Sequence, residues 1–465
     1  MEKTYHIAFD LGASSGRMVL GEYQDKILKL KEVYRFANTP VEMNGILYWD
    51  FPKLYQEIKN GIKIISKEDI EVDSLSVDTW GVDFGYLDKN YDLILLPRNY
   101  RNEEKNKFEN EIYQYISKKE LFQETGVYPA SINSIVQIYA DLQRYPWLKE
   151  AAETILFMPD LFNYFLSNER ATNYSIASTS GLLNKNREWS QKVIKALKFP
   201  EKWFKQEINN IKILDKITSS EVNYEPYKNT KVISSAGHDT AASILTVSED
   251  SVFLSCGTWS IMGIKVKEPI TNDEAFELEL TNEGTVDGKT KLLKNINGLW
   301  ILQELQRYWS ENGVMYSYED LTKKAKQSKY NEIIDVEDEK FISRCNMYQT
   351  IKNDFIKRGI DPPCTVGDFV RVVINSLAEK YKEVMHKLEK ITQKKFDQIH
   401  MVGGGIQNEL LCEFTAQKTH KTIITGPTEA SSFGNILSQL IALDLIKYND
   451  IYSVVSNSIR LKEHR

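Results

Sequence analysis

The first segment that could do chemistry is a glycine- and serine-containing turn at the end of a short apolar run, Asp10-Leu11-Gly12-Ala13-Ser14-Ser15-Gly16-Arg17. Successive N–H groups in such a turn can converge on an anionic oxygen, and the serine hydroxyls add further donors. A phosphate cradle and an ordinary hairpin turn explain the pattern equally well. Asp10 favours the cradle, because a carboxylate beside a phosphate requires a cation such as Mg²⁺ between them. We therefore expect a metal and a nucleotide to bind here together.

The second candidate is Gly237-His238-Asp239-Thr240, which stands before the helix formers Ala241 and Ala242. A carboxylate at the start of a helix feels the positive end of the helix dipole, which favours the ionised form that can accept a proton. Asp is also a preferred N-cap residue, and His238 can be a packed neighbour. From this motif alone, a structural cap is favoured over a catalytic base.

Three more polar clusters follow apolar strands, at 78–83, 255–260 and 402–408. In α/β sheets, ligands bind outside such strand ends. The stretch from Gly284 to Thr290 comes near to a Walker loop, but it is one residue short between its glycines and lacks the strand before and the helix after. Its Asp287-Gly288 pair indicates a hairpin turn instead.

The elements that must position these residues follow from hydrophobic periodicity. Alternation predicts a meander of strands, and the i, i+4 spacing of Leu54, Ile58 and Ile62 predicts an amphipathic helix after it. A second cycle begins at Val252, and the polar stretch from Thr246 to Ser251 before it marks the domain boundary. We predict domains at 1–247 and 248–465. The remaining predicted elements are strands at 5–9, 17–23, 28–36, 74–77, 232–234, 252–254 and 399–402, a long helix at 368–391, and a cap at Asn408.

Composition excludes several classes of protein. The 465 residues are 42% hydrophobic and 27% charged, as in ordinary globular proteins, and the net charge of −6 offers no basic surplus for nucleic acid. The longest apolar stretch, Gly434 to Ile446, is interrupted by polar residues and too short to span a bilayer. The N-terminus lacks the pattern of a secretory signal, so we expect a cytoplasmic protein without membrane association. The 4 cysteines are scattered and predict neither disulfides nor a zinc site.

Taken in order, these motifs resemble those of the FGGY carbohydrate kinases, from the first strand to Gly426-Pro427-Thr428-Glu429-Ala430. Within the family, the motifs are most similar to those of the members that act on L-rhamnulose, because other members usually carry different residues in the first turn and at Asp78-Thr79-Trp80-Gly81-Val82-Asp83. The resemblance implies an α/β fold of two actin/hexokinase-like (ribonuclease H-like) domains. Each would have a mixed five-stranded sheet flanked by helices, with an interdomain cleft. It also implies transfer of the ATP γ-phosphoryl group to the 1-hydroxyl of L-rhamnulose with Mg²⁺.

The resemblance also implies a role for individual residues. Asp239 would be the proton acceptor, and Asp10 would lie beside the metal. The sugar would be bound by Gly81, His238, Asp239, Thr240 and Asn295. ATP would be bound by Ala13, Ser14, Ser15, Gly16, Arg17, Thr258, Gln303 and Gly404. We expect the ketose and ATP as the partners of a monomer or homodimer.

Some alternatives remain open. The sugar could be another ketose, such as L-fuculose or L-xylulose, and a non-catalytic nucleotide-binding regulator can share this fold. Trp80 beside Gly81 suits a sugar ring, and plain core packing is the other interpretation. The family pattern generally has Asp after Tyr100-Arg101, where this chain has Asn102, so no role is assigned to that position.

Overall fold

The computed structural model describes residues 2–68, 70–222, 224–342 and 345–465. The chain divides into two compact units. The first unit comprises Met1–Thr246, Val266–Leu292 and Ser431–Ser458, and the second comprises Val247–Lys265, Leu293–Ala430 and Ile459–Arg465. The first unit therefore recruits two segments from the later half of the sequence, in addition to the predicted N-terminal part.

The first unit is built on a six-stranded mixed sheet in the order β11-β12-β6-β1-β2-β3. β1 (Thr4–Leu11), β2 (Ser15–Gln24) and β3 (Ile27–Ala37) form the predicted antiparallel meander, and β6 (Ser74–Thr79) runs parallel to β1. The predicted five strands are joined by a sixth, β11 (Lys212–Lys216), which pairs antiparallel with the edge of β12 (Lys231–Ser234). This short, polar strand lacks the apolar alternation that would have revealed it.

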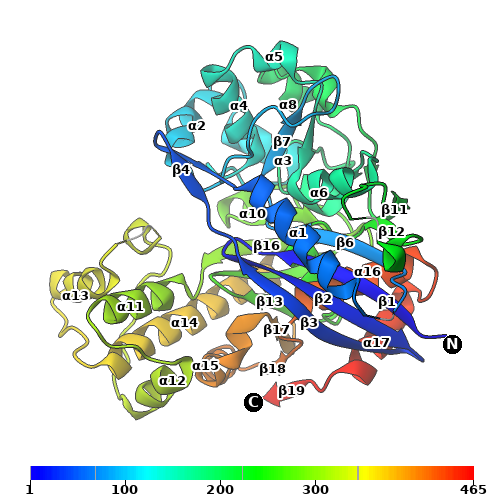
Figure 1. Cartoon of the computed structure of the whole chain (residues 1–465). Coiled ribbons are helices and arrows are strands. Elements are labelled where there is room, and N and C mark those ends of the chain that lie inside the picture. The colour runs from blue at the N-terminus through cyan, green and yellow to red at the C-terminus, as the bar shows by residue number, and fades with distance from the viewer. Residues whose placement is uncertain (1, 69, 223, 343–344) are drawn as a thin grey trace. The chain divides into compact units, whose positions relative to one another are not determined.

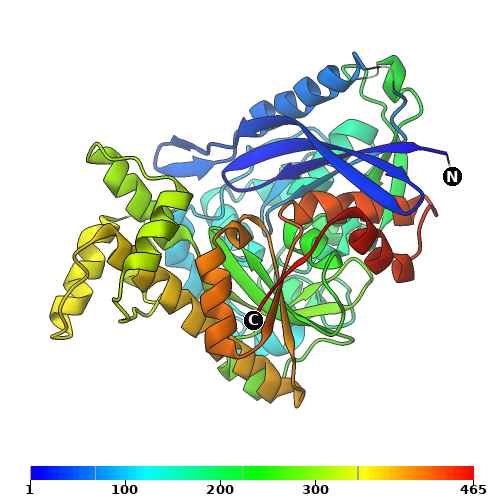
Figure 2. The ribbon, with the colours of Figure 1, turned by 90° about the horizontal axis from the view of Figure 1, so that it is seen from below.

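Helices cover both faces of this sheet (Figures 1 and 2). On one face lies α1 (Phe51–Ile65), whose buried Ile58 and Ile62 join Phe9 and Val77 in one core cluster, as the spacing predicts. On the other face lies α16 (Ala430–Ala442), where the Gln439 side chain donates to the carbonyl of Ile7 in β1. The sheet ends that carry Asp10 and Asp78 are thus fixed by the segment 431–458.

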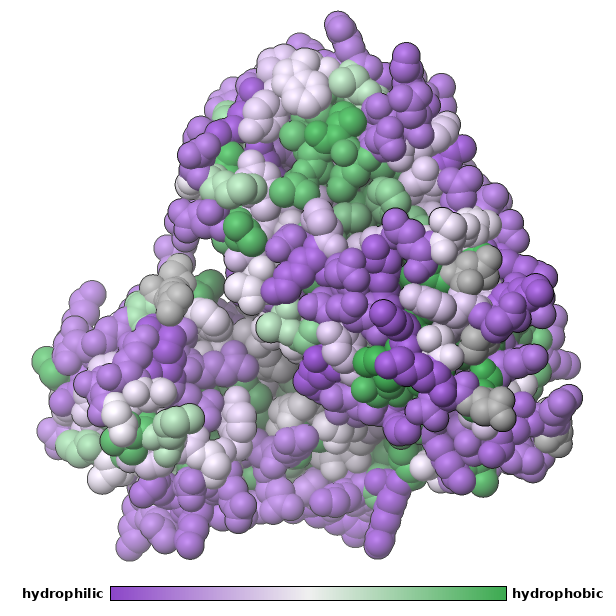
Figure 3. Space-filling view, in the orientation of Figure 1, coloured by the Kyte–Doolittle hydropathy of each residue, from purple (hydrophilic) through white to green (hydrophobic). Residues whose placement is uncertain are grey.

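The other elements of the first unit form smaller sheets and a helical region. The smaller sheets are strand pairs made of β4 (Val41–Met43) and β5 (Ile46–Tyr48), β7 (Phe84–Leu87) and β8 (Thr154–Phe157), and β9 (Thr172–Asn173) and β10 (Ile208–Asn209). The helices are α2 (Asn106–Ile112), α3 (Lys118–Thr125), α4 (Ser134–Arg144), α5 (Leu148–Ala151), α6 (Met158–Ser167), α7 (Tyr174–Ala177), α8 (Gln191–Ala196), α9 (Asp239–Leu245), α10 (Asp273–Glu277) and α17 (Ile451–Ser458). Figure 3 shows a mostly hydrophilic face with an apolar area over this unit.

The second large sheet has seven strands in the order β15-β16-β14-β13-β17-β18-β19. Its first strand, β15 (Thr281–Gly284), belongs to the segment Val266–Leu292 of the first unit. β13 (Val252–Cys256), β17 (Gln398–Val402) and β18 (Thr422–Thr425) are parallel, and β19 (Lys462–His464) pairs antiparallel with β18. The edge strands β15 and β19 extend the sheet beyond the five strands predicted. β14 (Trp259–Val266) ends in the first unit and β16 (Thr290–Asn297) begins there.

The helices of the second unit confirm the long amphipathic prediction. α14 (Val366–Thr392) contains the predicted 368–391, opens on a capping box between Thr365 and Asp368, and buries its apolar stripe. Asn408 caps α15 (Glu409–Thr419) by accepting from the Leu411 N–H, as predicted. The remaining helices are α11 (Trp300–Glu311), α12 (Tyr318–Gln327) and α13 (Met347–Lys357). Within the described residues, none of the helices has the length and apolar character that crossing a membrane requires.

Candidate active site

Hydrogen bonds to its carbonyl oxygens fix the conformation of the turn between β1 and β2. The Asn38 side chain donates to the Gly12 carbonyl at 2.8 Å, and the Asn38 N–H donates to the Ser14 carbonyl at 3.0 Å. The Gly12 N–H donates to the Ser15 carbonyl at 2.9 Å. Among the described residues, no hydrogen bond engages the N–H groups of Ala13 or Ser14. The turn can therefore present donors to an anionic oxygen, as the cradle hypothesis requires.

Gly16 has a different reason for being glycine. It is buried at the start of β2, and an added Cβ would lie 2.4 Å from the ring of Phe36. Packing alone explains its identity, so this position gives no support to a phosphate contact.

Asp10 and Arg17 face each other across the hairpin and form an ion pair. The Arg17 Nη2 and Nε donate to Asp10 Oδ2 at 2.7 and 3.0 Å, and the Ser432 hydroxyl donates to the same oxygen at 3.0 Å. All three bonds go to one oxygen of the carboxylate. In this structure the predicted metal residue and the predicted phosphate residue neutralise each other.

Asp78 lies beside Asp10 on the parallel strand β6 and is completely buried. Its Oδ2 accepts from Asn435 at 2.6 Å, while no described residue bonds its Oδ1. Burial, and then the negative charge of Asp10, raise the pKa of Asp78 well above its ordinary value. The sequence placed this residue in a polar cluster without assigning it a role.

Asp239 is the first residue of α9, and the N-cap position is occupied by His238. Its Oδ1 accepts from the N–H and hydroxyl of Thr240, and its side chain is 31% exposed. Burial, and then the charge of Asp10, raise the pKa of Asp239 to about 7. Desolvation and the like charge of Asp10 therefore act against the ionised form that the helix dipole favours.

Gly81 and His238 come together beside Asp239, because the end of β6 bridges to the residue before α9. An added Cβ on Gly81 would lie 3.4 Å from His238 Nε2 and 3.3 Å from the Thr179 hydroxyl. His238 Nε2 lies 3.4 Å from Asp239 Oδ1. The sugar residues predicted in the first unit thus form one group, with the buried Thr240 next in the chain.

Asp83 and Trp80 belong to the support of this group. The buried Asp83 accepts from Trp49 Nε1 at 2.6 Å, Trp80 Nε1 at 2.9 Å, Gln137 Nε2 at 2.9 Å and the Tyr100 N–H at 3.2 Å. Trp80 is only 5% exposed and packs on Trp49. The burial of Trp80 favours the core-packing interpretation, and Asp83 fixes the corner that carries Gly81.

Two of the predicted nucleotide residues of the second unit, Thr258 and Gly404, lie after the adjacent parallel strands β13 and β17, and the third, Gln303, lies in α11. The Thr258 hydroxyl donates to Gln303 Oε1 at 3.3 Å, which ties the turn after β13 to α11. Gly404 is exposed, and no atom lies within 4 Å of an added Cβ. Asn295, predicted to face the sugar, is an exposed residue of β16 in the second unit.

The described residues contain no group of three or more His, Cys, Asp or Glu side chains that could hold a metal by themselves. Mg²⁺ in kinases is typically held by one or two carboxylates together with substrate phosphates. The Asp10 carboxylate at the end of the turn fits that mode of binding, and the buried unpaired oxygen of Asp78 is its neighbour.

Comparison with known proteins identifies the protein family to which the chain belongs. The model of the FGGY family of carbohydrate kinases, N-terminal domain, matches residues 5–246, and that of the C-terminal domain matches residues 252–443. The chain therefore belongs to the FGGY family and is a carbohydrate kinase, an enzyme that uses ATP.

Individual relatives are similar over nearly the whole chain. A rhamnulokinase of Halalkalibacterium halodurans is 34% identical over 95% of this chain and 94% of the relative. A rhamnulokinase of Bacteroides thetaiotaomicron is 32% identical over 99% and 96%. Among solved structures, a gluconate kinase from Lactobacillus acidophilus has a TM-score of 0.79 at 15% identity, covering 100% of this chain and 94% of that one. The glycerol kinase of Plasmodium falciparum with ADP has a TM-score of 0.78 at 13% identity, covering 99% and 94%. The predicted fold class is confirmed.

Proposed function

We propose that this kinase transfers the γ-phosphoryl group of ATP to the 1-hydroxyl of L-rhamnulose, giving L-rhamnulose 1-phosphate and ADP. The observation that carries the proposal is Asp239, a partly exposed carboxylate beside Gly81 and His238 whose pKa is raised to about 7. The choice of sugar is supported by the similarity to rhamnulokinases over nearly the full chain.

The proposed step moves one phosphoryl group and one proton. The 1-hydroxyl oxygen forms a bond to the γ-phosphorus while the bond from that phosphorus to the ADP oxygen breaks. The hydroxyl proton passes to the Asp239 carboxylate. Phosphoryl transfer depends mainly on positioning and charge stabilisation, so backbone donors and an oriented base are the parts that the protein must supply.

The remaining roles are assigned as proposals. The turn residues Ala13, Ser14 and Ser15 contact the ATP phosphates, and Asp10 holds Mg²⁺ together with those phosphates. When bound, Mg²⁺ neutralises charge on the phosphates. Since Arg17 pairs with Asp10 in this structure, we propose that binding of the nucleotide frees its guanidinium for a phosphate oxygen. That sugar and nucleotide meet in a cleft between the two domains stays a prediction.

The proposed reaction is tested by a coupled ADP-release assay over a panel of ketoses with ATP and Mg²⁺. We expect L-rhamnulose to give the highest kcat/KM, ahead of L-fuculose and L-xylulose. Preference for another ketose would refute the sugar assignment and leave the kinase. Binding of ATP by calorimetry without turnover of any ketose would support a nucleotide-binding regulator instead.

The pH dependence of the rate should report the protonation of Asp239. Its carboxylate accepts a proton only when ionised, so kcat/KM for the ketose should fall about tenfold per pH unit below about pH 7 and level off above it. The residual activity of Asp239→Asn should lack this limb. A limb centred near the ordinary Asp value of about 4 would contradict the proposed environment of Asp239.

Substitutions at two neighbouring glycines, Gly403 and Gly404, distinguish an effect on nucleotide binding from an effect on stability. Because nothing surrounds an added Cβ on Gly404, Gly404→Ala should keep the stability and raise the KM for ATP by about tenfold, or ~1.4 kcal/mol, with the KM for the ketose unchanged. Gly403 has φ +85° and an added Cβ there would lie 2.8 Å from the Cys256 carbonyl, so Gly403→Ala should lower the stability. An unchanged KM for ATP in Gly404→Ala would remove Gly404 from the nucleotide site.

A further inference from the structure

A buried ion pair lies on the Nδ1 side of His238 and is formed by two residues, Lys291 and Glu283, that have no role in the proposed function. Lys291 is completely buried at the start of β16, and its Nζ lies 2.9 Å from Oε2 of the buried Glu283 on β15. These two residues flank the turn at Asp287-Gly288, which closes with a bond from the Thr285 N–H to the Lys289 carbonyl. The hairpin predicted there, in place of a Walker loop, is confirmed.

Stability alone does not explain a buried ion pair, because the cost of desolvating the two charges offsets most of their Coulombic attraction. The ammonium of Lys291 reaches one further group, Nδ1 of His238, at 3.2 Å. An ammonium only donates, so Nδ1 must be the acceptor of this bond. In a neutral imidazole the proton then lies on Nε2, on the side of Asp239 and Gly81.

Glu283 alone would favour the opposite tautomer, since its Oε2 lies 3.5 Å from the same Nδ1. The shorter contact from Lys291 decides between the two tautomers. A proton on Nδ1 would point an N–H donor at the Lys291 ammonium, which is also a donor, and leave this contact without an acceptor. Burial, and then the charge of Lys291, lower the pKa of His238 to about 3, so its ring is neutral at physiological pH. Burial would raise the pKa of Glu283, but Lys291 and His238 bring it below its ordinary value, so the carboxylate stays ionised.

We propose that Lys291, backed by Glu283, is a positioning residue that keeps the His238 proton on Nε2, so that His238 donates a hydrogen bond to the ketose next to Asp239. The inference rests on the proposed function for the identity of the ligand only. The tautomer itself is a property of the protein without ligand.

The direct test is the ¹⁵N spectrum of the full-length protein labelled at histidine, in which the two ring nitrogens of each tautomer give distinct shifts. The chain has 6 histidines, and the spectrum of His238→Gln identifies the signals of His238. We expect a protonated Nε2 and an unprotonated Nδ1 at neutral pH. A proton on Nδ1, or on both nitrogens, would overturn the proposal.

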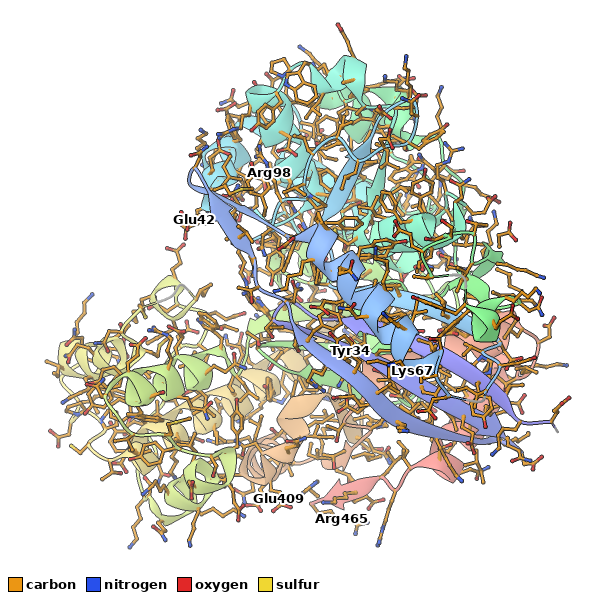
Figure 4. All side chains as sticks on the ribbon, in the orientation of Figure 1. Tyr34, Glu42, Lys67, Arg98, Glu409 and Arg465 are labelled. Atoms are coloured by element: carbon orange, nitrogen blue, oxygen red, sulfur yellow. The ribbon has the colours of Figure 1, made fainter. Side chains whose placement is uncertain are left out.

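The second measurement is kinetic and uses the variant Lys291→Met/Glu283→Gln, which removes both charges together. Loss of a group that orients a metal-bound histidine typically costs roughly 10- to 100-fold, and we expect a loss of similar size in kcat/KM for the ketose with the KM for ATP unchanged. The matched control is Arg98→Met/Asp141→Asn, which removes another buried pair of the first unit, 2.8 Å apart (Arg98 is labelled in Figure 4). The control should lose stability and keep kcat/KM.

The outcomes distinguish the two proposals. Failure of the wild type to phosphorylate any ketose would refute the proposed function, while the spectrum would still decide the tautomer. Equal kinetic losses in the variant and its control would show that Lys291 acts only on stability, which refutes the positioning role. If the variant does not fold, the wild-type spectrum decides alone.

Discussion

Replacing Asp239 by Asn is expected to lower kcat for ketose phosphorylation by about 10² to 10⁴, the usual contribution of a positioned general base. Asn has nearly the shape of Asp and its side-chain oxygen can still accept from Thr240, so the fold and the KM for ATP should be retained. Steady-state kinetics, with circular dichroism as the check on folding, measures this effect.

The matched control for this substitution is Asp160→Asn in the same unit. Asp160 is also buried, and burial raises its pKa to about 8, but it binds the Asn173 N–H instead of facing the sugar residues. We expect its kcat to match that of the wild type. An almost unchanged kcat in Asp239→Asn would remove Asp239 from the mechanism.

Replacing Gly434 by Ala is expected to destabilise the first unit by about 3 kcal/mol or more, because overpacking of a core typically costs 1–3 kcal/mol and the clash here is with backbone. An added Cβ would lie 1.8 Å from the carbonyl oxygen of Ala242, where α16 packs against α9. Either α9, which begins at Asp239, or α16, whose Ser432 bonds to Asp10, must then shift, so kcat should fall as well.

Urea unfolding followed by fluorescence measures the loss of stability as a lower midpoint. Gly404→Ala is the control for a glycine-to-alanine change, since its added Cβ meets no atom within 4 Å. An unchanged midpoint for Gly434→Ala would contradict the close packing of α9 and α16.

The parts of the fold that could be predicted from the sequence are those with strong local patterns. The hairpin around Asp10, the helix that contains Ile58 and the long helix from Asp368 all carry a clear period, and the structure confirms them. The added edge strand β11 was missed, because its exposed residues do not alternate between apolar and polar.

The parts of the site that could not be predicted depend on residues far apart in the sequence. Burial and the charge of Asp10 raise the pKa of Asp78, while Asn435 donates a hydrogen bond to it, and no local pattern brings these three residues together. Glu283 and Lys291 were missed because they flank the predicted hairpin turn at Asp287-Gly288, and the turn pattern assigns no role to the charged residues on either side of it. Two charged residues at strand positions on either side of a tight turn were the signal that could have found them.

In the proposed reaction the 1-hydroxyl oxygen of L-rhamnulose receives the phosphoryl group, and a single spectrum of the product can show which oxygen carries it. A proton–phosphorus correlation spectrum of the product formed from L-rhamnulose, ATP and Mg²⁺ is the direct measurement. The account predicts coupling of the new phosphorus signal to the two protons on carbon 1. Coupling to any other carbon-bound proton, or release of inorganic phosphate alone, would contradict it.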